Sequence, residues 1–218
     1  MTLKKNQKNK GMTYVELIVV LTIFSIISGI TIFDYKKFEH RVEIKDLASI
    51  IASKITEAQK NAQAGRQTSN GVFTTLDSSK KPKPSYGIRL DSTATSNPSP
   101  NASFIYFADL DNDGVYNISN NCGVPITNDE CLEKVEIHKG YLVKEIEFYD
   151  VNNSKLSLCP ATALVDITFK RAEPNAGFKS TSCDISTASE VKIKIHLPTF
   201  PEISAIISVH QSGRIQIK

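Results

Sequence analysis

Alternating aspartates are the residues of this sequence most suited to chemistry. Asp109, Asp111 and Asp113 precede Gly114 in the pattern DxDxDG, directly after the apolar run FIYFA. Alternate carboxylates can converge on one hard cation, and glycine permits the sharp turn around it, as in EF-hand loops. The pattern therefore predicts a Ca²⁺ site at the end of a strand.

Further ligands follow from the same loop positions. Asn117 falls at the ninth position, which often carries a ligand, and Val115 at the seventh, where the backbone carbonyl binds. The twelfth position holds Asn120, where an EF-hand has a bidentate glutamate. Asp129 or Glu130 can supply that oxygen if a disulfide folds the chain back. The alternative is a solvated Asp/Asn turn without metal. The predicted ligands are Asp109, Asp111, Asp113, Val115, Asn117 and Glu130.

A second chemical signal is a lone carboxylate in an apolar segment. Residues 12–33 are apolar and contain one charged residue, Glu16. About 20 such residues cross a bilayer core as a helix. A carboxylate inside such a segment costs roughly a few kcal/mol and therefore requires a partner. The simpler interpretation is an ordinary single-span anchor, in which Glu16 reaches the lipid headgroups.

The residues around Glu16 also resemble a known signature. Lys10, Gly11 and Met12 are followed by TYVE and the uncharged apolar run, a combination similar to the prepilin cleavage signature of type IV pilins and type II secretion pseudopilins. The resemblance implies that a prepilin peptidase cuts after Gly11, that Met12 becomes the N-methylated first residue and that Glu16 acts in assembly. The runs FIYFADLDNDGVYN and ISVHQSGRIQIK resemble minor pilins of the GspH/FimT type.

The assembly role of Glu16 has a physical basis. After cleavage, the new ammonium group of Met12 in one subunit is a natural partner for the Glu16 carboxylate of a neighbour. Pairing in a low dielectric removes an otherwise isolated charge and selects the register between subunits. We therefore expect the partners to be other pilin or pseudopilin subunits in a helical filament.

The charge distribution predicts an orientation in the membrane. The lysines among residues 1–11 are Lys4, Lys5, Lys8 and Lys10, and removing these four turns the formal charge of +3 into −1. By the positive-inside tendency, this leader stays cytoplasmic and the C-terminal domain is exported. We expect one N-terminal span in the inner membrane, and then incorporation into a pilus or pseudopilus.

Four cysteines lie in the exported part of the chain. An even number outside the cytosol favours disulfides, and four cysteines permit three pairings. We favour Cys122 with Cys131 and Cys159 with Cys183, which close two local loops. Zinc is disfavoured because the spacings lack CxxC and no histidine lies beside them.

The spacing of apolar residues predicts the helix that carries Glu16 and joins it to the rest of the chain. Residues 34–64 carry an apolar stripe with helical spacing, and Gly65 is a plausible stop. With no proline between positions 12 and 65, one helix of about 50 residues is expected. Its first half lies in the membrane or fibre core and its second half packs on a domain. The stripe consists of Ile44, Leu47, Ile51, Ile55, Ala58 and Ala62.

After Gly65 the pattern changes to short apolar runs between turn residues, which is typical of an antiparallel β domain. The predicted fold is therefore α+β, with a leader at 1–11, a membrane or fibre-core helix at 12–33, its amphipathic continuation at 34–65 and a β domain at 66–218. Strands are predicted at 71–76, 85–90, 103–108, 134–138, 145–149, 163–170, 190–197, 203–209 and 215–217.

The sequence favours a structural role. It contains none of the motifs HExxH, GxSxG, GxGxxG or P-loop, so no enzyme activity is predicted. The leading hypothesis is a minor pilin or pseudopilin subunit. An alternative is a minor pilin that binds DNA during uptake, and a third is a membrane-anchored enzyme or lipid-surface protein with a coincidental leader. DNA would contact a basic patch of Lys192, Lys194, Arg214 and Lys218.

Overall fold

The computed structural model describes residues 11–66, 84–93, 102–117, 122, 130–157, 159–160 and 164–218, and it leaves out the side chains of residues 30–34. Residues 1–10 of the predicted leader 1–11 lie outside the described residues, as does the predicted strand 71–76. So do Asn120 and Asp129. The chain divides into two compact units, Met1–Arg41 and Val42–Lys218.

One helix, α1, runs from Tyr14 to Gln63 over 50 residues and agrees with the predicted continuous helix. Its N-terminus is a capping box, in which the Glu16 amide donates to Thr13 Oγ1 and the Thr13 amide donates to a Glu16 carboxylate oxygen. Gly65, at φ 60°, ends the helix in a Schellman motif. The amides of Gly65 and Arg66 donate to the carbonyls of Ala62 and Asn61. Among the described residues, no helix combines the length and the hydropathy needed to cross a membrane.

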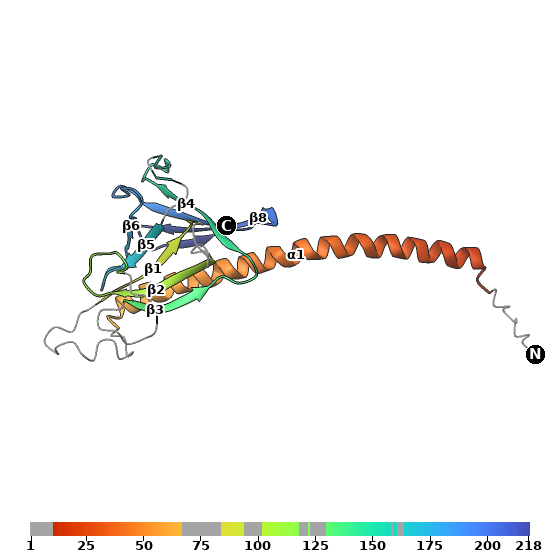
Figure 1. Ribbon diagram of the computed structural model, residues 1–218, viewed down its shortest axis with the longest axis horizontal. Helices are drawn as coiled ribbons and strands as arrows, with labels where there is room; N and C mark the ends of the chain where they lie inside the picture. The colour runs from red at the N-terminus through yellow and green to blue at the C-terminus, as the bar shows by residue number, and fades with distance from the viewer. Residues whose placement is uncertain are drawn as a thin grey trace, which may run out of the picture. The chain divides into compact units, whose positions relative to one another are not determined.

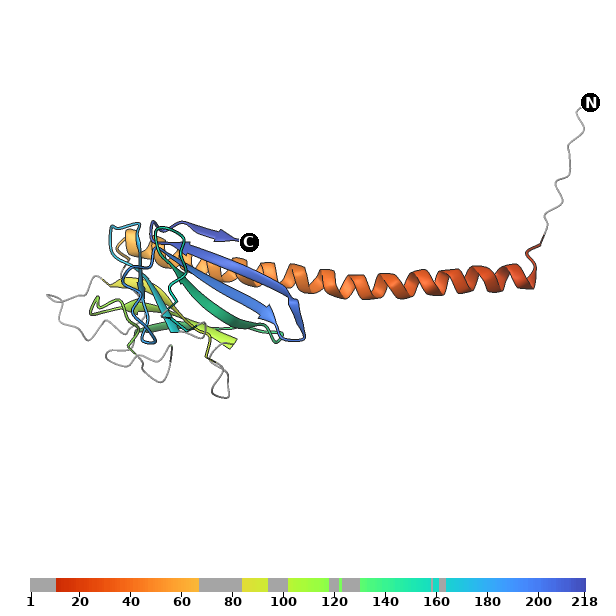
Figure 2. The same cartoon turned by 90° about the horizontal axis from the view of Figure 1, so that it is seen from above.

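The strands of the second unit form two antiparallel sheets (Figures 1 and 2). The five-stranded sheet has the order β3-β2-β1-β5-β6, with β1 at Ser85–Asp91, β2 at Ser103–Asp109, β3 at Cys131–Glu136, β5 at Leu164–Phe169 and β6 at Ala176–Lys179. The four-stranded sheet has the order β4-β7-β8-β9, with β4 at Leu142–Tyr149, β7 at Glu190–Leu197, β8 at Phe200–His210 and β9 at Ile215–Ile217. The predicted α+β class is confirmed.

Strand boundaries differ from the prediction mainly at sheet edges. Strand β3 begins at Cys131 rather than at 134, and β4 begins at Leu142 rather than at 145; both pairings contain an irregularity that breaks strict alternation. Strand β6 was not predicted. It is an edge strand of only four residues that contains Gly177, so its alternation of buried and exposed residues is too short to mark a strand in the sequence.

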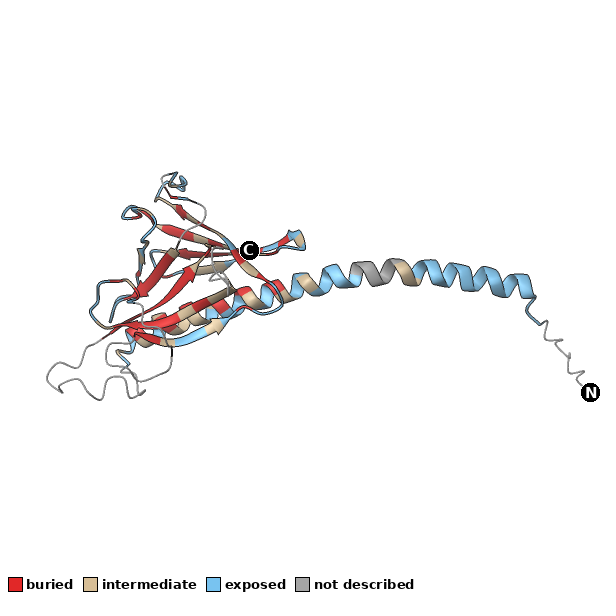
Figure 3. Ribbon diagram, viewed as in Figure 1, coloured by how far each residue is buried: buried red, intermediate tan, exposed pale blue. Residues whose placement is uncertain are grey.

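The core of the second unit is built around the amphipathic half of α1. Its buried stripe packs in one cluster with apolar residues of both sheets, including Ile88 of β1 and Ile193 of β7. In Figure 3 the buried face of this half lies toward the strands. The stripe differs from the prediction at one place, because Ala48 is fully buried and Leu47 only partly. The buried residues are Ile44, Ala48, Ile51, Ile55, Ala58 and Ala62.

The five-stranded sheet is covered on both faces, which explains why β1 is buried along almost its whole length. Ile88 and Leu90 enter the main core. Arg89, on the opposite face, lies directly across from Asp166 of β5. Its guanidinium donates two hydrogen bonds to the carboxylate, at 2.6 and 2.5 Å, and both side chains are buried. The two charges therefore depend on each other for compensation.

Removing one member of this pair should destabilise the fold strongly. Arg89→Met leaves the Asp166 carboxylate buried and uncompensated, which we expect to lower the free energy of unfolding by about 3–5 kcal/mol. Adding Asp166→Asn keeps an acceptor but removes the charge, and should recover part of that loss. Urea unfolding followed by circular dichroism measures both variants. Equal stability of Arg89→Met and wild type would contradict the dependence.

Candidate functional site

The acidic loop follows β2 and crosses the outer face of the five-stranded sheet. Strand β2 ends at Asp109, and the chain continues through residues 110–117. Glu130 comes directly before β3, where its carbonyl accepts a hydrogen bond from the Ala108 amide at 2.9 Å. This backbone pairing places Glu130 beside Asp109, although 20 residues separate them in the sequence.

Three of the predicted ligands lie together. One carboxylate oxygen from each of Asp109, Asp111 and Glu130 lies within 4.8 Å of the other two. Asp113 is outside this group, and its Oδ1 instead accepts a hydrogen bond from the Val115 amide at 2.7 Å. The structure thus brings together residues from the loop and from the strand that returns to it.

Backbone amides orient two of these carboxylates. The Gly114 amide donates to Asp109 Oδ2 at 2.9 Å. Glu130 accepts from the amides of Leu110 at 2.9 Å and Asn117 at 2.6 Å, so its two oxygens bridge both ends of the loop. The second oxygen of Asp109, Oδ1, is buried and has no hydrogen-bond partner in the described part of the chain.

The other two predicted ligands lie in the same loop. The Asn117 side-chain amide donates to Asp111 Oδ2 at 3.1 Å. Val115 is half-buried next to Gly114. Metal binding by any of the six residues stays a prediction.

The loop is held on the sheet by contacts at its middle and its end. Asn112, at φ 60°, accepts hydrogen bonds from the amide and the hydroxyl of Ser85, at 3.2 and 2.7 Å. The Tyr116 ring packs against Phe107, and the Arg89 guanidinium lies 4.9 Å from the Tyr116 ring centre. The Tyr116 amide donates to the buried Asp166 carboxylate. These contacts fix the loop on the sheet, so its carboxylates are held in place before any ligand arrives.

The disulfide between Cys122 and Cys131, with a Cα–Cα distance of 4.9 Å, lies next to Glu130 in sequence. Cys131 packs with Phe107 and Tyr116 in a small cluster on this outer face. The favoured pairing of these cysteines is therefore the one found in the structure, and it ties the start of β3 to the loop region.

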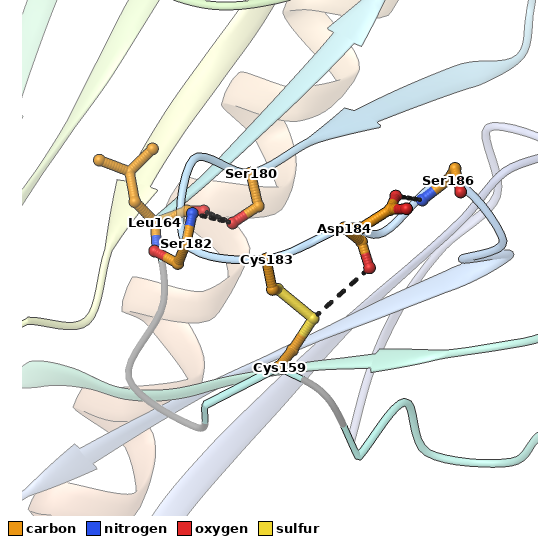
Figure 4. Close-up of a disulfide and its surroundings, with 7 residues drawn as sticks. All are labelled: Cys159, Leu164, Ser180, Ser182, Cys183, Asp184 and Ser186. Atoms are coloured by element: carbon orange, nitrogen blue, oxygen red, sulfur yellow. Dashed lines mark hydrogen bonds between the residues drawn. A yellow bond between two sulfur atoms is a disulfide. The ribbon is translucent and has the colours of Figure 1, made fainter.

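The second disulfide joins Cys159 and Cys183, with a Cα–Cα distance of 5.3 Å (Figure 4). Cys159 lies between β4 and β5, and Cys183 between β6 and β7, so each belongs to a connection between the two sheets. Near the bridge, the Ser180 hydroxyl donates to the Leu164 carbonyl at 2.6 Å. This disulfide therefore links the two crossover connections and has a structural role.

Burial governs the electrostatics of the acidic group. The pKa of Asp109 is raised to about 7, chiefly by burial and to a smaller extent by the nearby Asp111 and Glu130, while the amides of Gly114 and Asn112 oppose this rise. Burial also raises the pKa of Glu130, again with a contribution from neighbouring carboxylates. A full set of ionised carboxylates is therefore unfavourable here without a cation.

These shifts predict how the metal-free protein responds to pH. Because the pKa of Asp109 is higher in the folded than in the unfolded chain, its contribution to stability is complete below about pH 4 and is lost as pH rises through about 7. In chelator, Asp109→Asn should match wild type near pH 4 and be more stable at pH 7.5. Urea unfolding at several pH values measures the difference. A constant difference across this range would contradict the assignment.

The start of α1 is the second candidate site. Glu16 lies in the first turn, within the capping box, among apolar side chains that are exposed in the structure. Tyr14 and Val15 are 77% and 69% exposed. The capping role was not predicted, although Thr13 and Glu16 show the T-x-x-E signal.

The residues of the predicted DNA patch are interspersed with acidic ones. Lys192 lies 3.6 Å from Glu190, and Lys194 lies 3.8 Å from Glu145. The Lys192 ammonium also lies over the Tyr149 ring. DNA binding stays a prediction, and these acidic neighbours weaken the local positive potential.

Comparison with known proteins gives structural similarity alone. No protein-family model matches the sequence, and no curated protein matches it either. Two crystal structures of the type IV minor pilin FimU from Pseudomonas aeruginosa are similar to this chain. The first has 12% identity and a TM-score of 0.41, covering 83% of this chain and 92% of the other. The second has 11% identity and a TM-score of 0.39, covering 80% and 91%. We therefore argue the function from the residues of this chain.

Proposed function

We propose that this chain is a structural subunit, a minor pilin or pseudopilin, that assembles into a filament through the first half of α1. The observation that supports this most is the exposure of Leu17, Ile18, Val19, Val20 and Leu21, all of them apolar. Five consecutive residues cover more than one turn of 3.6 residues, so every face of the helix is apolar there. Such a helix needs lipid or other helices around it.

The membrane is the first environment that suits this segment. We propose that residues 12–33 anchor the unassembled subunit in the inner membrane, with residues 1–11 cytoplasmic and the β domain outside. The four lysines among residues 1–11 favour this orientation. The disulfides of the second unit agree with an oxidising compartment.

The filament is the second environment. Apolar helices of neighbouring subunits can replace lipid around α1, but Glu16 then needs compensation for its charge. We propose that prepilin peptidase cuts after Gly11 and that the ammonium of Met12 in one subunit pairs with Glu16 of the next. A carboxylate has about four acceptor sites, so Glu16 can keep its bond from the Thr13 amide and accept the ammonium as well.

The native N-terminus tests the processing step. Mass spectrometry of protein purified from its own cells should show a chain that begins with N-methylated Met12. The intact cysteine pairs serve as an internal check that the exported form was isolated. A native chain that still begins with residues 1–11 would contradict cleavage, and with it the ammonium that pairs with Glu16.

Three variants separate the charge of Glu16 from its capping role. Glu16→Gln keeps the capping box but removes the charge, and should reduce incorporation into filaments by about 100-fold or more, since breaking a buried pair costs about 3 kcal/mol. Glu16→Ala should be at least as defective. Glu39→Ala, which removes an exposed carboxylate from the same helix, is the matched control and should assemble normally.

Incorporation is measured by immunoblotting of sheared filaments, with circular dichroism to verify that each variant is folded. If Glu16→Gln assembles normally while Glu16→Ala fails, then Glu16 acts by capping the helix and the pairing mechanism is wrong.

A further inference from the structure

We propose that Asp109, Asp111 and Glu130 bind one Ca²⁺ ion, which joins the end of β2 to the residue directly before β3. This inference is independent of the pilin function, because none of its residues lies in the first half of α1. It begins with the convergence of three carboxylate oxygens within 4.8 Å of one another. Acidic residues often lie close together on protein surfaces, so the cluster needs a second observation.

The second observation is the orphaned oxygen of Asp109. Asp109 is 1% exposed, and its Oδ1 has no hydrogen-bond partner among the residues that the structure describes, while Oδ2 accepts from the Gly114 amide. A buried carboxylate oxygen without a partner carries a large desolvation cost. Since Asp109 belongs to the converging group, a cation bound there would compensate for this cost.

The ligand chemistry points to a hard cation. All three groups are carboxylates, and no nitrogen or sulfur ligand belongs to the group. Two oxygens bound at about 2.3–2.6 Å on opposite sides of Ca²⁺ lie up to ~5 Å apart, whereas the shorter Mg²⁺ bonds of about 2.0–2.1 Å allow only ~4.2 Å. Three carboxylate oxygens within 4.8 Å of one another fit the flexible shell of about six to eight oxygens around Ca²⁺, whereas Mg²⁺ demands near-ideal octahedral geometry.

The surrounding contacts prepare the site without filling it. The amides of Leu110 and Asn117 orient Glu130, and the Gly114 amide orients Asp109. Each of these carboxylates keeps further acceptor sites for an ion. Three protein carboxylates leave the remaining positions of Ca²⁺ to water and to the loop, where the carbonyl of Val115 and the side chain of Asn117 are further predicted ligands.

A Ca²⁺ ion here would bind the loop to the start of β3. Asp109 and Asp111 belong to the β2 side, and Glu130 comes directly before β3 and the disulfide cysteine Cys131. With few protein ligands, affinity in the range of extracellular modules, Kd of about 10⁻⁴–10⁻³ M, is expected. The ion would then act as a structural clamp in an exported domain.

Full-length protein in detergent, stripped with EGTA, tests the proposal. Adding 10 mM CaCl₂ at pH 7.5, about ten times the weakest expected Kd, should raise the melting temperature of wild type by several degrees, and the same amount of MgCl₂ should have a smaller effect. Asp109→Asn keeps an acceptor for the Gly114 amide and should lose the Ca²⁺ response. Asp150→Asn is the matched control, because Asp150 also accepts bonds within its own turn but lies outside the acidic group; its response should equal that of wild type.

A direct binding measurement keeps the test independent of variant folding. Tb³⁺ should show luminescence on excitation of tyrosine, since Tyr116 lies in the same loop, and Ca²⁺ should displace it. The proposal is overturned if wild type shows neither a melting shift nor displaceable luminescence. It is also overturned if Asp109→Asn responds like wild type, or if Mg²⁺ stabilises as strongly as Ca²⁺.

Discussion

The structure depends on α1, whose two halves differ in how their apolar side chains are covered. From Ile44 to Ala62, one stripe of α1 is buried in the core that both sheets share. From Met12 to Ile27, large apolar side chains are exposed, on every face of the helix around Leu17 to Leu21. Exposed apolar surface of this extent is unfavourable in water and marks an interaction surface. The proposed membrane anchor and filament core are two successive ways to cover it.

The second unit contains two groups of buried charged residues. The Arg89–Asp166 pair and the acidic group at Asp109 lie on the outer face of the five-stranded sheet. Tyr116, which belongs to the acidic loop, contacts both Arg89 and Asp166. In the pair, the Arg89 guanidinium compensates the charge of the Asp166 carboxylate through two short hydrogen bonds. The acidic group has backbone amides but no cationic side chain among its hydrogen-bond partners that the structure describes. This difference is the physical reason to look for an ion at one site and not at the other.

Local patterns predicted much of the fold, and long-range pairing set the rest. The helix follows from the spacing of Ile44, Ile51 and Ile55, and its end from Gly65. The edge strand β6 was missed because it has only four residues. No sequence pattern predicts that Arg89 of β1 pairs with Asp166 of the neighbouring strand β5. The three aspartates marked the acidic loop, yet the Asp113 carboxylate accepts a hydrogen bond from the Val115 amide and lies outside the acidic group. Sequence spacing left Asp129 and Glu130 as alternative ligands. Glu130 lies beside the loop because its backbone pairs with β2 at Ala108.

The account is tested most directly by finding what surrounds the exposed apolar half of α1 in assembled material. A photoreactive amino acid at Leu21 can be crosslinked in sheared native filaments, and the product identified by mass spectrometry. The account predicts a crosslink to the N-terminal helix of another subunit in filaments, and to lipid in the membrane fraction. Crosslinks to lipid alone, with no subunit attached to Leu21 in any filament preparation, would contradict it.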